Sequence, residues 1–119
     1  MRTTEQVLRD HLERRRCGDL EGDLRANYSD ELVVLSKDGI YRGKDGIRKC
    51  AAILKKILPD ATFDFDVVLA ADEYGMLGWR GAGGNGSEAC HGADSYVIRD
   101  GRIIAQTIQY EVWPEGSES

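Results

Sequence analysis

The stretch Cys90–Trp113, CHGADSYVIRDGRIIAQTIQYEVW, holds the strongest strand pattern of the chain and decides the fold. Two runs rich in β-branched and aromatic residues flank Arg99-Asp100-Gly101, and Asp-Gly is a common turn in β-hairpins. The loop has either two residues, Asp100-Gly101, or three, with Arg99 included and Gly101 as a left-handed bulge residue. We expect the three-residue loop.

The length of this loop decides which side chains share the inner face, because side chains alternate between the two faces of a strand. The three-residue loop predicts one common face for Asp94, Tyr96, Ile98, Ile104, Gln106, Ile108 and Tyr110. The other register would turn Thr107 inward in place of Gln106, and the sequence leaves this choice open. A carboxyl group on a mostly apolar face is unfavourable unless it is paired or protonated. Asp94 is therefore the first candidate for a functional residue.

Length and charge narrow the class of protein. The chain has 119 residues, enough for one domain over residues 1–119, and residues 114–119 are expected to be a frayed tail. Its net charge is −5 and its basic residues are scattered, so nucleic acid is not an expected partner. No apolar run has the length of a membrane span, so no membrane partner is expected. The three cysteines lack close spacing and indicate reduced thiols in a cytoplasmic protein.

The order of the predicted elements indicates an α+β fold. A helix with a Thr3–Gln6 capping box is expected to run to about Cys17, and a short helix capped by Asp19 follows it. A short strand pair around residues 32–42 leads into a third, amphipathic helix from Gly43 to Pro59. Further strands at 62–69 and 76–80 precede the final hairpin, and the glycine-rich residues 81–87 are expected to be a flexible hairpin connection. The helices should cover the concave face of a curved antiparallel sheet.

Several short strings in this order resemble the nuclear transport factor 2-like superfamily, in particular its SnoaL-like and ketosteroid-isomerase-like branch. The resemblance spans about residues 5 to 112 and rests on Gly18-Asp19-Leu20, Tyr28-Ser29-Asp30-Glu31, Tyr41-Arg42-Gly43 followed by Ile47, and Asp94-Ser95-Tyr96 leading to Gly101-Arg102-Ile103. It implies a cone-shaped, cystatin-like fold in which the curved sheet wraps around about three helices and encloses a pocket. It also favours the three-residue loop, because the inward positions of the family then fall on Asp94, Gln106, Ile108 and Tyr110.

Similarity to the isomerases does not carry their activity over to this chain. In those enzymes a carboxylate on the first strand removes a proton, while a tyrosine and a protonated aspartic acid hold the oxyanion. The resemblance places Ser36 at the position of the base, His11 at the tyrosine and Asp94 at the oxyanion aspartate. Serine cannot serve as that base at neutral pH, so steroid isomerisation by the known route is not expected.

His11 and Asp94 form the predicted catalytic pair. His11 lies within the apolar stripe of the first helix, and the resemblance points both residues into one cavity. Asp94 would orient His11 or donate a hydrogen bond, and His11 would exchange a proton with the substrate. The expected ligand-binding residues are Tyr28, Trp79, Gln106 and Tyr110. The alternative is that His11 and Asp94 are a structural pair without a catalytic role.

The sequence predicts a protein with a pocket for an apolar, oxygen-bearing small molecule. No spacing indicates a metal site or a nucleotide motif, and no cofactor is expected. Whether the pocket is catalytic, as in an isomerase, dehydratase or cyclase, or belongs to a non-catalytic ligand-binding or dimerisation module is left open. A transport adaptor is a third alternative.

A homodimer is also expected, through the outer face of the final hairpin. The favoured register makes that face too apolar to be exposed to solvent. It would carry Val97, Ile103, Ala105, Thr107 and Trp113 beside Ser95, Gln109 and Glu111.

Overall fold

The computed structural model describes residues 1–84 and 88–114, and the side chains at 88, 89, 113 and 114 are not described. Of the glycine-rich connection predicted at 81–87, Gly81 and Ala82 instead end a strand, and residues 85–87 lie outside the described residues. Of the tail predicted at 114–119, Pro114 ends the last strand, and residues 115–119 lie outside the described residues, as does the side chain of Trp113. The elements, in chain order, are α1 (Thr4–Arg16), α2 (Leu20–Asn27), β1 (Tyr28–Ser36), β2 (Gly39–Arg42), α3 (Lys44–Ile57), β3 (Thr62–Ala71), β4 (Tyr74–Ala82), β5 (Glu88–Arg99) and β6 (Arg102–Pro114).

Local sequence signals set the ends of the helices. Thr3 and Gln6 form the predicted capping box of α1, and Asp19 accepts a hydrogen bond from the backbone of Gly22 at the start of α2. Gly43 precedes α3 with φ +74°, a conformation that favours glycine. Tyr28 is both the C-cap of α2 and the first residue of β1, and its side chain is buried.

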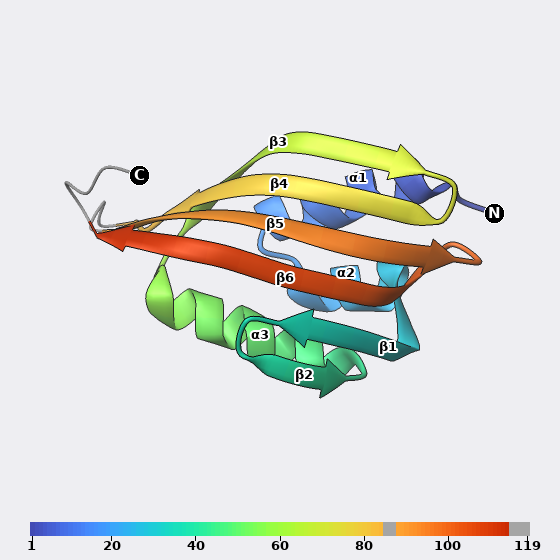
Figure 1. Ribbon diagram of the computed structural model, residues 1–119, viewed down its shortest axis with the longest axis horizontal. Helices are drawn as coiled ribbons and strands as arrows, with labels where there is room; N and C mark the ends of the chain where they lie inside the picture. Colours follow the sequence, from blue (N-terminus) through green and yellow to red (C-terminus); the bar gives the residue numbers. More distant parts are fainter. Residues whose placement is uncertain (85–87, 115–119) are drawn as a thin grey trace.

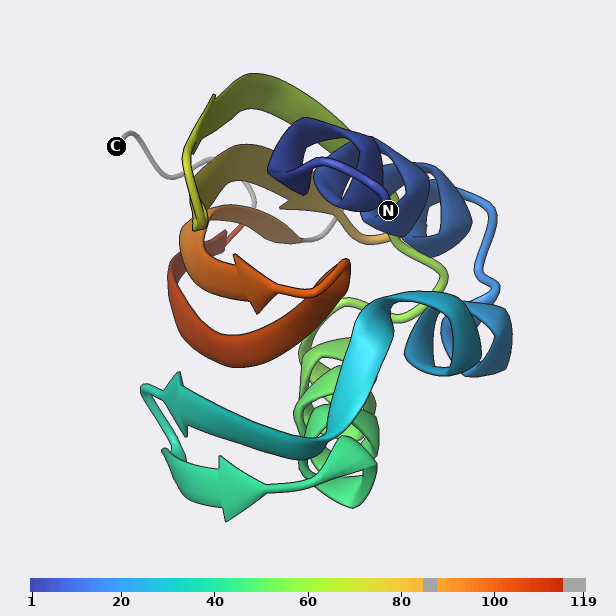
Figure 2. The same ribbon diagram turned by 90° about the vertical axis from the view of Figure 1, so that its right-hand side faces the viewer.

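One curved, open sheet holds all six strands in the order β2-β1-β6-β5-β4-β3. Figure 1 shows the long strands β3 to β6 bending together, with α1 and α2 behind them. In Figure 2 the sheet curls around the helices, and α3 lies beside the shorter strands β1 and β2. The predicted α+β cone is confirmed, although the sheet is mixed, because β1 and β6 run parallel.

The final hairpin has a two-residue turn, so the predicted three-residue loop is wrong. Arg99 pairs with Arg102, and both Asp100 and Gly101 have positive φ, as a type I′ turn requires. The register then shifts, because Ile98 pairs with Ile103 and Val97 with Ala105, which leaves Ile104 as an extra residue. This β-bulge restores the alternation expected from a three-residue loop for every position beyond Ile104.

The bulge explains which side chains face inward. Gln106 and Tyr110 are buried and Ile108 is partly buried, as predicted, while Thr107 is exposed. Ile103 was expected on the outer face, but it is fully buried in the core, and Ile104 is only partly buried. The cause is that a bulge residue reverses the facing of every residue between itself and the turn.

Candidate functional site

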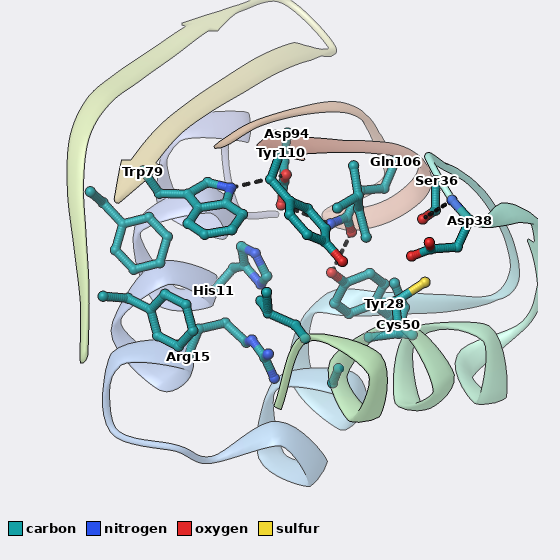
Figure 3. Close-up of a pocket in the computed structure, with 16 residues that line it drawn as sticks. His11, Arg15, Tyr28, Ser36, Asp38, Cys50, Trp79, Asp94, Gln106 and Tyr110 are labelled. Atoms are coloured by element: carbon teal, nitrogen blue, oxygen red, sulfur yellow. Dashed lines mark hydrogen bonds between the residues drawn. The ribbon is translucent and has the colours of Figure 1, made fainter. Parts of the chain in front are cut away.

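A cavity opens between the concave face of the sheet and α1 and α3. The centre of a water-sized sphere can occupy about 70 Å³ of it, within about 660 Å³ of atom-free space that includes solvent at the mouth. Figure 3 shows the lining side chains converging from both layers. All six residues singled out from the sequence line this cavity: His11, Tyr28, Trp79, Asp94, Gln106 and Tyr110. The other polar lining groups belong to Arg15, Ser36, Asp38 and Cys50, and the remaining lining is apolar.

Asp94 is held by three donors, one from its own strand β5 and one from each neighbouring strand, β4 and β6. Its Oδ1 accepts a hydrogen bond from Trp79 Nε1 at 3.1 Å, and its Oδ2 lies 3.4 Å from both the Tyr96 hydroxyl and Gln106 Nε2. Burial raises the pKa of Asp94 from 3.8 to about 6, although the hydrogen bond from Trp79 and the proximity of His11 act in the opposite direction. Asp94 can therefore gain or lose a proton near neutral pH.

His11 is buried, and both of its ring nitrogens are occupied. Nδ1 lies 2.8 Å from Asp23 Oδ2, and Nε2 lies 2.9 Å from the hydroxyl of Tyr96. The sequence predicts that His11 and Asp94 approach each other directly or through one water, and the structure shows no direct hydrogen bond between them. Tyr96 connects the two residues instead, because its hydroxyl contacts both side chains.

Sequence reasoning missed Asp23, the carboxylate that pairs with His11. Asp23 is fully buried on α2 and also accepts a hydrogen bond from Asn27 Nδ2 at 2.8 Å. A signal was available, because Asp23 and Asn27 follow Leu20 by three and seven residues and so share its helix face. Polar residues at those positions indicate a buried polar cluster.

The hydroxyl of Tyr96 has a single proton, so it can donate to only one of its two neighbours at a time. A hydrogen bond to both neighbours therefore requires that the other one, Asp94 Oδ2 or His11 Nε2, donates to the hydroxyl oxygen. Tyr96 thus links the hydrogen bonds of His11 to those of Asp94.

Aromatic side chains form much of the cavity wall. The rings of Trp79 and Tyr110 lie 5.9 Å apart, and Tyr28 donates a hydrogen bond to Gln106 Oε1. Burial raises the pKa of Tyr110 to about 12, and the neighbouring charge of Asp38 adds to this effect. Tyr110 therefore stays protonated at neutral pH.

The structure places Ser36, the residue at the isomerase base position, in the cavity lining at the end of β1. Asp38 lies two residues further on, is exposed, and also lines the cavity. Within residues 1–84 and 88–114, no group of three potential ligands is arranged to hold a metal ion. Among the same residues, no helix is both long and apolar enough to cross a bilayer.

A cone of curved sheet and three helices around an interior cavity defines the nuclear transport factor 2-like class of proteins. Within that class, residues 8–106 match the SnoaL-like domain, and the chain belongs to this family. A comparison with curated proteins gives no match.

Solved structures show the same fold at low sequence identity. An NTF2-like protein from Burkholderia thailandensis is 21% identical with a TM-score of 0.79, and the match covers 93% of this chain and 92% of that one. A candidate polyketide cyclase from Sinorhizobium meliloti is 16% identical with a TM-score of 0.73, covering 87% and 94%. TerC, co-crystallised with polyporic acid, is 13% identical with a TM-score of 0.74, covering 91% of each chain. At these sequence identities, the three matches show that the fold is similar and do not show that the function is shared.

Proposed function

We propose that the protein binds an apolar, oxygen-bearing small molecule in the cavity and performs cofactor-free acid–base chemistry on it. The reaction would be an isomerisation, dehydration or cyclisation. The observation that carries the proposal is the Asp94 carboxyl group, which lines an otherwise largely apolar cavity and is oriented by Trp79, Tyr96 and Gln106. A few convergent polar groups in an apolar cavity are typical of small-molecule sites.

In this proposal Asp94, rather than His11, exchanges the proton with the substrate. His11 has both ring nitrogens engaged, so it acts through Tyr96 as a positioning residue. Asp23 fixes the orientation of the His11 ring. A carboxyl group that titrates near neutral pH suits a general base or acid at that pH.

The related folds agree with this class of function. The protein from Sinorhizobium meliloti is named as a candidate polyketide cyclase, and TerC was co-crystallised with polyporic acid. Both names involve oxygen-bearing organic molecules.

Proton exchange at a ketone tests the proposal. α-Tetralone incubated with the protein in D₂O should lose its α-proton NMR signal faster than in buffer, with a rate that rises as pH passes through about 6. Asp94→Asn should abolish the enhancement. Asp38→Asn is the matched control, because Asp38 is a second carboxylate in the lining of the same cavity. Exchange that survives Asp94→Asn would refute the assignment.

A non-catalytic ligand-binding module is the second candidate. Among the described residues, every buried side-chain nitrogen and oxygen has a hydrogen-bond partner. A fully satisfied polar network can rigidify a core without catalysis. Binding of α-tetralone, detected as a shift of the Trp79 indole N–H resonance, without any exchange at its α-carbon would favour this alternative.

The proposal includes a homodimer through the outer face of the sheet. Apolar side chains that are exposed or partly exposed lie on adjacent strands of that face: Val33, Leu35, Ile40, Tyr74, Val97 and Ala105. An apolar surface of this kind is commonly covered by a partner, and a second copy would cover it with the same residues. We also propose a cytoplasmic location, supported by three free cysteines.

A further inference from the structure

Arg15 brings a positive charge to the lining of the cavity. It follows His11 by four residues on α1, so both side chains lie on the same face of the helix. The side chain is half-buried. In Figure 3 it extends beneath the ring of His11 toward α3.

The neighbouring arginines of the last turn of α1 are paired, whereas Arg15 has no ion-pair partner within the described part of the chain. Arg14 bonds to the carboxylates of Asp10 and Asp19, both within 2.9 Å, and Arg16 bonds to Glu13 at 2.8 Å. Among the described residues, the guanidinium of Arg15 has no carboxylate partner and no hydrogen-bond acceptor. A half-buried guanidinium without a counter-ion is available to bind an anion.

The charge of Arg15 acts on the interior of the cavity. Burial raises the pKa of both Tyr28 and Tyr96 well above the usual range, and Arg15 opposes this rise at each hydroxyl. These tyrosines belong to the hydrogen-bond network that holds Asp94. An anionic group beside Arg15 would therefore lie close to the proposed reactive carboxyl group.

Arg15 also lines a second hollow, between α1 and α3, together with Arg16, Lys55 and Asp60. The two hollows share Arg15 and the apolar residues Ala51, Leu54 and Phe63. Three cationic side chains and one carboxylate thus line a groove beside the cavity, in a chain whose net charge is −5. A local excess of positive charge attracts anions to this side of the cavity.

We propose that the ligand is an organic acid, whose carboxylate is bound by Arg15 while its apolar body fills the cavity toward Asp94. This inference rests on the proposed function and adds the charge of the ligand to it. Arginine matches a carboxylate with two parallel hydrogen bonds, and apolar surroundings strengthen them. The carboxylates of Asp94 and Asp38 repel a ligand bound in the opposite orientation, because both line the same cavity.

Two probes of nearly equal shape test this inference: 2-naphthoate, which is an anion, and 2-naphthamide, which is neutral. Binding is followed at pH 7.5 by calorimetry and by the indole N–H resonance of Trp79, which reports on the cavity through its bond to Asp94. We expect 2-naphthoate to bind about tenfold or more tightly than 2-naphthamide, as a hydrogen bond to a charged group implies. Arg15→Gln should remove this preference and leave the amide within about threefold of its original affinity.

Arg14→Gln is the matched control, because Arg14 belongs to the same helical turn but is paired with Asp10 and Asp19 and lines neither hollow. It should leave the preference for the acid intact. Arg15→Lys should restore part of the preference, because lysine keeps the charge and loses the planar fork. Equal affinity of the two probes for the unmodified protein, or equal weakening of both by Arg15→Gln, would overturn the inference while leaving the proposed pocket function standing. If neither probe shifts the Trp79 resonance, the proposed ligand binding fails, and this inference fails with it.

Discussion

Asp94→Asn should stabilise the protein at pH 8 and have much less effect at pH 4. Burial raises the pKa of Asp94 from 3.8 to about 6, so the folded protein holds this proton more tightly than the unfolded chain does. Between these two values the folded state binds more protons, and the free energy of unfolding falls as pH rises. The ionised carboxylate therefore destabilises the fold above pH 6, and the destabilisation disappears on acidification.

The magnitude follows from the two pKa values. The full difference corresponds to about 3 kcal/mol. About 2 kcal/mol of it should develop between pH 4 and pH 8, and less if water in the cavity screens the charge. Asparagine has nearly the shape of a protonated aspartic acid. Its Oδ1 can accept from Trp79, and its Nδ2 can donate to Tyr96, which in turn donates to His11.

Urea unfolding of both proteins at pH 4 and pH 8 measures this effect. Titrations common to both proteins cancel when the free energy of unfolding is compared between them at each pH. The gain from Asp94→Asn should be larger at pH 8 by about 1 to 2 kcal/mol. Asp64→Asn is the control, because Asp64 is an exposed carboxylate on β3. A gain that is equal at both pH values, or larger at pH 4, would refute the reasoning about burial.

Three further predictions use other features of the fold. Gly92→Ala should lower the free energy of unfolding by about 1 to 3 kcal/mol in urea titrations, because the added methyl group would overlap the indole ring of Trp79. The same overlap should shift the Trp79 indole resonance. An unchanged resonance would show that the overlap is relieved elsewhere. Leu35→Glu combined with Val97→Glu should convert a dimer to a monomer in sedimentation experiments, because charge would enter the apolar outer face; a dimer that persists has its interface elsewhere. The protein should have no steroid isomerase activity, because Ser36 stands at the position of the isomerase base and cannot serve as that base. Enzyme-like conversion of a Δ5-3-ketosteroid in a spectrophotometric assay would contradict this prediction.

Features of the chain that depend on neighbours in sequence could be predicted. The Thr3–Gln6 box, the Asp19 cap and the inward position of His11 follow from the local chemistry of helices. Alternation along one strand placed Asp94 and Tyr96 on the inner face. The resemblance to the SnoaL-like branch brought these elements together in the correct fold.

The register of the final hairpin depended on two features that compensate for each other. The sequence predicts a three-residue loop, whereas the structure has a two-residue turn and a bulge at Ile104. Both arrangements place Gln106 inward, so its facing was predicted correctly despite the incorrect loop, whereas Ile103 was placed on the wrong face. A bulge is stabilised by the packing of the whole strand pair, which no short string of residues encodes.

The partners of the polar groups were decided by tertiary structure alone. His11 meets Tyr96 across 85 positions of the chain, and its pairing with Asp23 depends on how α1 packs against α2. Arg14 and Arg16 form ion pairs with carboxylates, whereas Arg15, which lies between them in sequence, lines the cavity. Sequence determines which groups point inward, because facing follows from the geometry of a single helix or strand. Which of those groups meet depends on the angles and registers between elements, which are set only when the whole core packs.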